Sequence, residues 1–379
     1  MIYLDNGATS FPKPKVMVSA MNLCMIKYCG NPGRSGHDMS MRTGEEVYKA
    51  RKVLTEFFNM EKPDQIIFTA NCTEALNLGI KGILSPGDHV ITTAMEHNSV
   101  LRPIVALEEK GIIHTILPCR EDGTLDPKLV RLAIRENTKL IVCTHAANVT
   151  GTIMPLKEIG KIARENEILF MVDGAQGAGH LPLDVKELGI DLFAAPGHKG
   201  LMGPMGTGFL YLGKDICLNP IMEGGTGTAS KELVQPMELP EGFEVGTVNA
   251  PGIAGLRAST EYVDSIGVGT IETYESGLIS ILDQALRNMG GLQVYGPLER
   301  GKKAGITAFN IRGKSCEEVA ERLNKDWQIA VRGGYHCAGL AHKTIGTWDQ
   351  GAVRISVSPY NTKKQIKTAI EAVYKISMD

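Results

Sequence analysis

The chain has 379 residues, of which 43% are hydrophobic and 22% are charged, and its formal net charge is -2. This length is enough to bury a substantial core and predicts two or three domains. Charges of both signs are interspersed, so the sequence offers neither a basic stripe for nucleic acid nor a polybasic membrane anchor. Small molecules and other proteins are therefore the expected partners.

Cysteine usage and the first residues favour a cytoplasmic protein. The eight cysteines are scattered, without a CxxC pair or the spacing of a disulfide framework, which predicts reduced thiols. The sequence opens without a basic segment followed by an apolar stretch, and no run reaches the roughly 18 apolar residues of a membrane helix. We expect a cytoplasmic chain without a membrane-spanning segment.

Seven short apolar or β-branched runs alternate with helical patterns in the first part of the chain. The segments 126–135 and 156–166 have the length and periodicity of crossover helices, so the pattern predicts a mostly parallel sheet covered by helices. Ligands bind such sheets beyond the carboxyl ends of the strands. The seven predicted strands cover residues 65–70, 89–94, 112–117, 140–144, 169–172, 192–195 and 208–212.

The second part of the chain has a different pattern. Residues 215–251 are rich in Gly, Pro and acidic groups and lack periodicity, which indicates a long connecting or active-site segment. A smaller α+β domain is expected after it. Its elements are helical patterns at 253–288 and 315–324, strand-like runs at 305–311 and 353–357, and a terminal helix from residue 362.

Lys199 lies between a predicted strand and the glycine-rich stretch 203–208, where the backbone can approach a ligand closely. A lysine desolvated in a cleft loses its proton more readily and can form a Schiff base, which makes it a covalent catalyst. For a lysine in a loop without such neighbours, a solvated side chain is the simpler interpretation. The hypothesis therefore depends on the groups that accompany Lys199.

A carboxylate is the first of these groups. Asp173 follows the predicted strand 169–172, where it can pair with a protonated pyridine nitrogen and strengthen an electron sink. The 26 positions between Asp173 and Lys199 equal about one βαβ unit, so both side chains can reach one crevice. A helix cap would explain Asp173 alone equally well.

Three other polar segments also follow predicted strands. Thr73 opens a helix whose N-terminus can hold a phosphate, although a plain cap explains it equally well. His97 can stack on a planar cofactor, and Asn148 offers an amide to a carboxylate or a ring oxygen, or forms an Asx turn. We expect these strand ends to converge on one crevice.

Cys337 stands apart from the other seven cysteines, which lie in apolar or ordinary helical contexts. It follows two glycines, which we expect to let it move, and His336 and the nearby arginines would favour its ionised form. The thiol is thus a candidate nucleophile. A buried structural thiol is the simpler interpretation of any lone cysteine.

Together these segments resemble the cysteine desulfurases and selenocysteine lyases of the class V aminotransferase family, particularly the second, SUF-type group. The resemblance runs almost end to end. It is carried by Tyr3-Leu4-Asp5-Asn6-Gly7-Ala8, Arg34-Ser35-Gly36-His37, Thr73-Glu74-Ala75, Glu96-His97, Asn148-Val149-Thr150-Gly151, Asp173-Gly174-Ala175-Gln176, Gly197-His198-Lys199, Gly246-Thr247 and Arg332 through Ala338.

The resemblance implies an α/β protein of the pyridoxal-phosphate-dependent transferase fold type I. Its large domain, residues 15–250, would hold the mostly parallel seven-stranded sheet and bind the cofactor. Residues 1–14 and 251–379 would form the smaller α+β domain that carries the cysteine loop.

Roles follow from the resemblance residue by residue. Lys199 would bind pyridoxal 5'-phosphate covalently. Asp173 would contact the pyridine nitrogen, Gln176 the ring hydroxyl, and His97 would stack on the ring. Three residues would lie near the phosphate: Cys72, Thr73 and His198. Thr247 would reach the phosphate from the neighbouring subunit, which implies a homodimer. Substrate would be bound by Arg354 as the carboxylate clamp, with Asn148, Arg332 and His37.

In the implied reaction the amine of the substrate displaces Lys199, the freed lysine moves the alpha proton, and Asp173 stabilises the electron-rich cofactor. Cys337 then attacks the sulfur of L-cysteine. The products would be L-alanine and a persulfide on Cys337, whose sulfur passes to an acceptor protein or a reductant.

The sequence departs from the family pattern at three positions. Pro196 replaces the usual serine two residues before His198, Cys72 replaces a small or hydroxyl residue, and Tyr335 replaces the first histidine of His-His-Cys. These changes leave L-selenocysteine open as the substrate. Two further hypotheses also stay open: a class V aminotransferase or β-lyase that acts without a nucleophilic thiol, and a non-catalytic scaffold for sulfur delivery.

Overall fold

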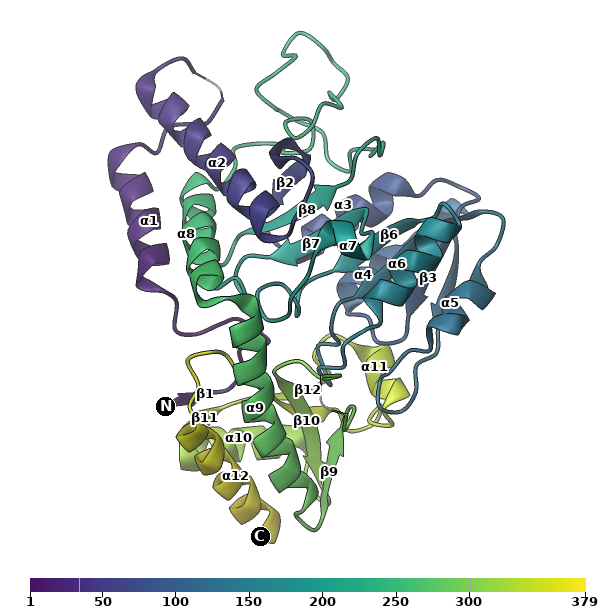
Figure 1. Ribbon diagram of the computed structural model, residues 1–379, viewed down its shortest axis with the longest axis vertical. Coiled ribbons are helices and arrows are strands. Elements are labelled where there is room, and N and C mark those ends of the chain that lie inside the picture. Colours follow the sequence, from purple (N-terminus) through teal and green to yellow (C-terminus); the bar gives the residue numbers. More distant parts are fainter. Residues whose placement is uncertain (34, 300) are drawn as a thin grey trace.

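A seven-stranded sheet forms the centre of the larger part of the molecule (Figure 1). The computed structural model describes residues 1–33, 35–299 and 301–379. The strand order is β2-β8-β7-β6-β5-β3-β4, in which only β8 runs antiparallel to its neighbours. The strands are β2 (Ile66–Thr69), β3 (His89–Thr93), β4 (Ile113–Leu117), β5 (Thr138–Thr144), β6 (Leu169–Asp173), β7 (Leu192–Pro196) and β8 (Gly208–Leu212). All seven predicted strands and the mostly parallel sheet are confirmed.

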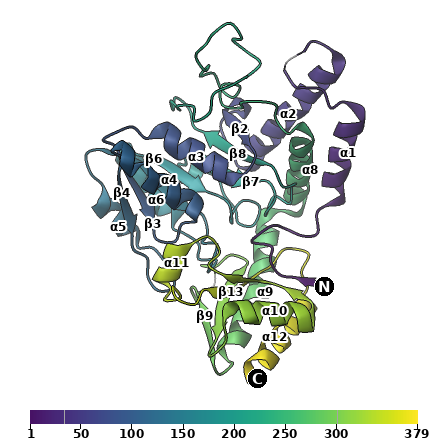
Figure 2. The same cartoon turned by 180° about the vertical axis from the view of Figure 1, so that it is seen from behind.

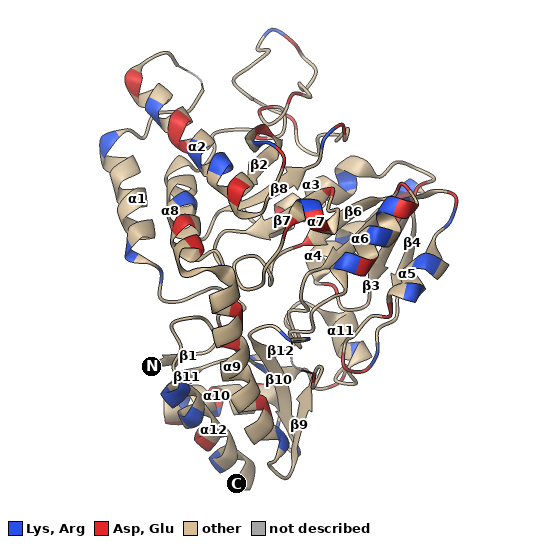
Figure 3. Cartoon of the chain, viewed as in Figure 1, with Lys and Arg blue, Asp and Glu red and all other residues tan. Residues whose placement is uncertain are grey.

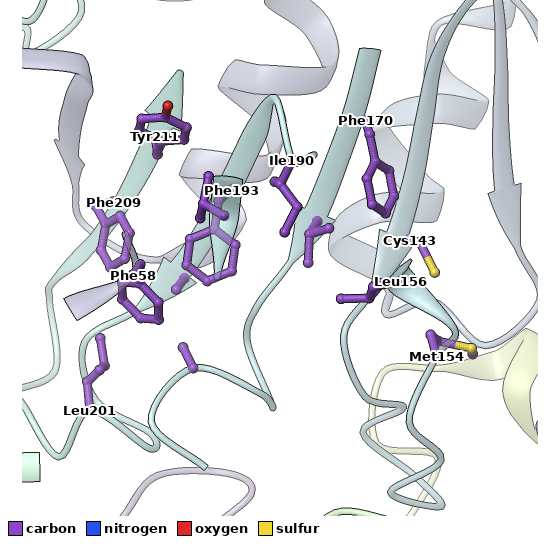
Figure 4. Close-up of a cluster of buried hydrophobic side chains, with 14 of the residues drawn as sticks. Phe58, Cys143, Met154, Leu156, Phe170, Ile190, Phe193, Leu201, Phe209 and Tyr211 are labelled. Carbon is purple, nitrogen blue, oxygen red and sulfur yellow. The ribbon is translucent and has the colours of Figure 1, made fainter. Parts of the chain in front are cut away.

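Both faces of this sheet are buried, because successive side chains of a strand point to opposite sides. In β6, Phe170 and Val172 pack into one apolar cluster, whereas Met171 packs into the other. Phe58 joins the first cluster from the end of a helix, and Figure 4 shows its ring beside Phe193. The two apolar layers explain why the strands read as nearly continuous hydrophobic runs.

Helices cover the two faces in separate groups. The cluster on one face includes side chains of α3 (Cys72–Ile83) and α4 (Asn98–Ala106). The cluster on the other face includes side chains of α2 (Asp38–Phe57), α5 (Pro127–Ala133), α6 (Leu156–Glu165) and α8 (Ala250–Ile266). Two further helices are α1 (Lys15–Lys27), which lies beside α8 in both views, and the short α7 (Val185–Leu188) (Figures 1 and 2).

The rest of the chain builds a second, smaller sheet below the first in Figure 1. It is antiparallel, with the order β12-β13-β10-β9. Its strands are β9 (Leu292–Tyr295), β10 (Ile306–Ile311), β12 (Arg332–Gly334) and β13 (Ala352–Ser356), and its helices are α9 (Val268–Arg287), α10 (Cys316–Trp327), α11 (Gly339–Thr344) and α12 (Lys363–Met378). The N-terminal strand β1 (Ile2–Tyr3) joins this region by pairing with β11 (Ile329–Ala330). The division of domains at residue 250 stays a prediction.

The helical pattern predicted over 253–288 is confirmed and consists of two helices, α8 and α9. The break falls at Gly267, whose φ of +85° lies in the left-handed region that favours glycine. Periodicity continues across the break because both helices bury one apolar face, which conceals the interruption in the sequence. After the break the chain leaves the layer formed by α1, α2 and α8, and α9 runs to the smaller sheet (Figure 1).

Acidic and basic residues are interspersed along outer helices such as α2 and α6 (Figure 3). Within the described ranges, no helix combines the length and apolar character needed to cross a bilayer.

Replacing Phe193 by alanine should destabilise the fold, because its fully buried ring contacts Phe58 and Phe209 at centroid distances of 4.9 and 5.9 Å. We expect a loss of about 3–5 kcal/mol in the free energy of unfolding, measured by urea denaturation. Leu132→Ala is the control, since Leu132 is 80% exposed. Equal stability of the two variants would contradict the importance of this cluster.

Candidate active site

Three neighbouring strands end at one edge of the large sheet, and the parallel register brings their last residues together. Thr144 of β5 pairs with Asp173 of β6, and Asp173 pairs with Ala194 of β7. A cavity of about 100 Å³ opens at this edge. It is lined by Asn71, Cys72, Thr73, Leu76, His97, Ser99, Thr144, Asn148, Asp173, Ala175, Gln176, Pro196, His198 and Lys199. The strand ends therefore converge on one crevice, as expected.

Lys199 and Asp173 face this cavity from adjacent strand ends. Burial lowers the pKa of the Lys199 ammonium, and the attraction of Asp173 opposes that shift. Burial raises the pKa of Asp173, while hydrogen bonding from Ala175 and the charge of Lys199 act against it. The lysine is thus biased towards the neutral amine, the form that attacks a carbonyl carbon.

The loop that carries Lys199 packs tightly on the preceding segment. A Cβ on Gly200 would lie 2.2 Å from the carbonyl oxygen of Ala178 and 2.5 Å from the ring of His180. His180 in turn holds Glu275 of α9 at 3.0 Å in a buried ion pair. This pair joins the lysine loop to the helix that leads to the smaller sheet.

The N-terminus of α3 forms one end of the cavity. Asn71 caps the helix by accepting a hydrogen bond from the Glu74 backbone, and Thr73 Oγ lies 2.8 Å from Ser99 Oγ. His198 adds an imidazole whose buried Nδ1 has no hydrogen-bond partner among the described residues. Backbone donors, hydroxyls and an unpaired imidazole nitrogen together can accommodate an anionic group.

His97 is held in one orientation at the N-cap of α4. Its Nδ1 accepts a hydrogen bond from the Ser99 backbone at 3.0 Å and lies 2.8 Å from Ser99 Oγ. Burial, then the positive charges of Lys199 and Arg332, lower the pKa of His97 to about 4. The ring is therefore neutral at physiological pH, which suits stacking on a planar ligand. Ser99, which sequence reasoning missed, orients both His97 and Thr73.

Gln176 and Asn148 complete the lining near the smaller sheet. Gln176 donates through Nε2 to the carbonyl of Gly7 at 3.0 Å, so the N-terminal segment contributes to the site. Asn148 donates through Nδ2 to the carbonyl of His336 at 2.7 Å, while its buried Oδ1 lacks a partner in the described part of the chain. Asn148 thus connects the cavity to the cysteine loop.

Two arginines lie opposite each other in the smaller sheet, where Arg332 of β12 pairs in register with Arg354 of β13. Directly opposed residues project from the same face of an antiparallel pair, and like charges there are unfavourable unless an anion compensates them. Asp5 compensates in part, with its Oδ1 2.8 Å from Arg354 Nη2. The buried Nε of Arg354 has no partner among the described residues. The pair is suited to a carboxylate.

Cys337 is exposed beside this arginine pair. Its Sγ lies 4.0 Å from Arg332 Nη2. The imidazole of His336 does not flank the thiol as expected, because it is buried and its Nε2 lies 3.0 Å from the carbonyl of Ala352. The backbone is also more constrained than its glycines suggested, since the Cys337 carbonyl accepts a hydrogen bond from Asn98 at 2.8 Å. Among the described contacts, Arg332 is the charged group that reaches the thiol.

Thr247 and His37, which the resemblance assigned to cofactor and substrate, do not line the cavity of their own chain. Thr247 is exposed and lines a separate hollow with Ala70 and Glu74. His37 caps α2 through Nδ1, which accepts from the Ser40 backbone at 3.2 Å. Arg34 of the same motif lies outside the described residues.

Comparisons with known proteins agree with this geometry. The family model described as aminotransferase class-V matches residues 2–368. The chain belongs to this family.

Its relatives include a probable cysteine desulfurase of Methanothermobacter thermautotrophicus, 36% identical over 99% of this chain and 94% of that protein. A cysteine desulfurase of Pectobacterium atrosepticum is 31% identical over 99% of this chain and 93% of that protein. Among solved structures, an apo cysteine desulfurase of Thermococcus onnurineus superimposes with a TM-score of 0.93 at 34% identity, covering 100% of this chain and 94% of that one. The cysteine desulfurase CsdA of Escherichia coli gives 0.88 at 28% identity, covering 98% and 94%.

This member of the class V aminotransferase family also has a buried carboxyl group to which sequence reasoning gave no role. Oε1 of Glu96 accepts hydrogen bonds from the Thr93 hydroxyl at 2.7 Å and the Thr144 backbone at 3.0 Å, which ties the ends of β3 and β5 together. Burial raises the pKa of Glu96 to about 8, against the effect of those two bonds. The motif Glu96-His97 was the only sequence signal for it.

The protonated state of Glu96 predicts a pH-dependent stability. The folded chain retains a proton that the unfolded chain loses above pH 4.5, so stability is present at low pH and is lost as pH rises towards 8. In Glu96→Gln the side chain at position 96 cannot ionise. Between pH 5 and 8 the free energy of unfolding should therefore decrease less in this variant than in the wild type, by roughly 2–4 kcal/mol. Urea denaturation at both pH values measures this difference.

The matched control for that experiment is Glu121→Gln, which changes an exposed carboxylate. This variant should follow the wild-type pH profile. A Glu96→Gln profile parallel to that of the wild type would show that Glu96 is ionised in the folded chain.

Proposed function

We propose that this chain is a pyridoxal-phosphate-dependent cysteine desulfurase that converts L-cysteine to L-alanine and takes the sulfur onto Cys337 as a persulfide. The observation that carries the proposal is the exposed Cys337 thiol beside Arg332, itself paired in register with Arg354. Asn148 joins this loop to the cavity that holds Lys199 and Asp173. The loop of the nucleophile and the arginine pair thus both contact Asn148, which lines the same cavity as Lys199.

The residues of the cavity fit pyridoxal phosphate. Lys199 supplies an amine with a lowered pKa for the aldehyde, and Asp173 supplies a carboxylate for the ring nitrogen. Thr73 and the N-terminus of α3 are suited to the phosphate, as is His198, whose Nδ1 is buried without a partner in the described structure. When bound, the cofactor withdraws electrons from the Cα of the substrate.

Each side chain then has a task that its position allows. The guanidinium groups of Arg332 and Arg354 orient the substrate carboxylate, and Asn148 supports them from the large sheet. Lys199 moves the proton at Cα, and Asp173 keeps the ring nitrogen protonated. Neutral His97 covers the ring without adding positive charge near the Lys199 amine.

Sulfur transfer balances without an external oxidant. A bond forms between Cys337 Sγ and the substrate sulfur while the bond from that sulfur to Cβ breaks. The electron pair of the broken bond remains on the three-carbon fragment, which takes up a proton and leaves as alanine. Because Cys337 is exposed, its persulfide is accessible to an acceptor protein or a thiol reductant.

The test is alanine and sulfide release from L-cysteine with a thiol reductant, for wild type beside Cys337→Ala and Lys199→Ala. Both variants should lose at least about 100-fold in kcat/KM, since each removes a group that forms a covalent bond to substrate or cofactor. Cys337→Ala should keep the cofactor absorption band, and Lys199→Ala should lose its Schiff-base form. Cys217→Ala, which removes another exposed thiol, is the control and should remain active.

Parallel assays with L-selenocysteine test the selenocysteine lyase hypothesis, which the departure at Tyr335 in the cysteine loop leaves open. Tyr335 packs edge-on against His342, at a centroid distance of 5.3 Å. Turnover of selenocysteine without turnover of cysteine would identify a selenocysteine lyase. Full cysteine turnover by Cys337→Ala would overturn persulfide transfer.

The proposal includes a homodimer in which Thr247 completes the cofactor site of the partner. It is supported by the exposed position of Thr247 outside its own cavity. The preceding segment also exposes large apolar side chains that a second copy would cover. They are Ile221, Met222, Leu233, Val234 and Met237.

Co-expression of Thr247→Ala and Lys199→Ala chains tests this arrangement. Thr247→Ala alone should bind the cofactor about tenfold more weakly, because a hydrogen bond to a charged phosphate is lost. If Thr247 acts in the partner's site, the mixed dimer has one intact site and should recover about half of the wild-type activity per dimer. A mixed dimer no better than Thr247→Ala alone would contradict the shared site.

A further inference from the structure

Cys72 occupies a position at which this chain departs from its family. It is the first residue of α3, and its side chain is 8% exposed and lines the cofactor cavity. The side chain also belongs to the apolar cluster beneath α3. Two roles are therefore possible for it, an apolar filler of the cluster or a polar contact in the cavity.

The polar contact is present. Sγ of Cys72 donates a hydrogen bond to Oδ1 of Asp173 at 3.5 Å, within the range for a sulfur donor. Burial, followed by the charge of Asp173, raises the pKa of the Cys72 thiol well above its usual range. The thiol therefore remains protonated at neutral pH and acts as a donor rather than as a nucleophile.

Both donors to Asp173 act on the same oxygen. The backbone N–H of Ala175 donates to Oδ1 at 2.9 Å, and Cys72 donates to Oδ1 as well. None of the described hydrogen bonds reaches Oδ2. Two donors on Oδ1 fix the plane of the carboxylate and leave Oδ2 for the ring nitrogen of the cofactor.

We infer that Cys72 is a positioning residue that holds Asp173 ionised and oriented towards the pyridine nitrogen. The inference rests on the proposed role of Asp173. It gives the substitution a function, because a thiol at the start of α3 compensates part of the cost of burying the Asp173 charge. A glycine or alanine at this position would leave the carboxylate with the Ala175 donor alone.

The described charged and titratable groups that interact with Asp173 lie on several neighbouring elements. They are Lys199 after β7, Cys72 on α3, Glu96 after β3 and Cys143 on β5. Glu96 is mostly neutral below its pKa of about 8, and burial keeps the Cys143 thiol protonated. Lys199 and Cys72 are therefore the neighbours that favour the ionised carboxylate near neutral pH.

The experiment compares cofactor release from the holoenzyme for wild type, Cys72→Ala and Cys72→Ser. Alanine removes the donor, whereas serine keeps a donor in a side chain of similar size. Cys72→Ala should release pyridoxal phosphate about three- to tenfold faster, and Cys72→Ser should stay within about twofold of wild type. Release is followed by absorbance after transfer to cofactor-free buffer.

The pH dependence of release gives a readout that simple loss of packing would not change. Without the Cys72 donor, Asp173 takes up a proton more readily. Acid-induced release in Cys72→Ala should therefore shift to higher pH by about half a unit, with wild-type behaviour in Cys72→Ser. His97 and His198, whose pKa values lie near 4, are the same in all variants.

Cys143→Ala is the matched control. It removes a fully buried thiol from β5 that does not line the cavity, and cofactor release should be unchanged. Asp173→Asn shows whether unchanged cofactor release in Cys72→Ala reflects the role of Cys72 or that of Asp173 itself. If it leaves release and its pH profile unchanged, the proposed role of Asp173 fails.

If Asp173→Asn changes release while Cys72→Ala matches wild type, only the role of Cys72 is overturned. Equal defects in Cys72→Ala and Cys72→Ser would likewise overturn it, because they would show that the thiol acts through packing.

Discussion

The buried guanidinium of Arg354 joins the parts of the chain on which the site depends. It lies on β13, donates to the Asn148 carbonyl beside the large sheet at 3.0 Å, and pairs with Asp5 at 2.8 Å. A buried charge is costly unless it is paired, so these contacts constrain the smaller sheet relative to the larger one. Because β12 belongs to that sheet and Cys337 closely follows β12, the same contacts place the thiol near the cavity.

The electrostatics of the cavity follow from burial more than from pairing. Desolvation lowers the pKa values of Lys199 and His97 and raises that of Glu96, so the amine, the imidazole and the carboxyl group are each biased towards the neutral form. Burial also raises the pKa of Asp173, but at this carboxyl group hydrogen bonds and the nearby Lys199 cation together oppose the shift. Negative charge is thereby concentrated where a pyridinium nitrogen would lie.

The departures from the family pattern lie in two places, the cofactor cavity and the cysteine loop. Pro196 and Cys72 line the cavity, where Cys72 donates to Asp173 and the resemblance implies that Pro196 lacks a phosphate donor. Tyr335 lies in the cysteine loop and packs on His342. The departures thus lie among the residues proposed to hold the cofactor and beside the thiol, while Lys199 and Asp173 match the family pattern.

The sequence by itself determined the seven strands of the large sheet and the placement of Asp173 and Lys199 at its carboxyl edge. These features are local, since an apolar run of strand length followed by a polar residue can be read from neighbouring positions. The helical pattern over 253–288 is confirmed as well, but it did not indicate the break at Gly267, because amphipathic periodicity continues across this residue although the backbone does not.

Only the tertiary structure decided the contacts between distant segments. Arg332 lies opposite Arg354 because of a strand register, Cys72 meets Asp173 across 101 positions of sequence, and His336 turns away from Cys337 to bond Ala352. The neutral state of Glu96 is likewise a consequence of burial by several elements. Such features depend on how elements pack, and hydrophobic periodicity does not encode which side chains meet across a sheet.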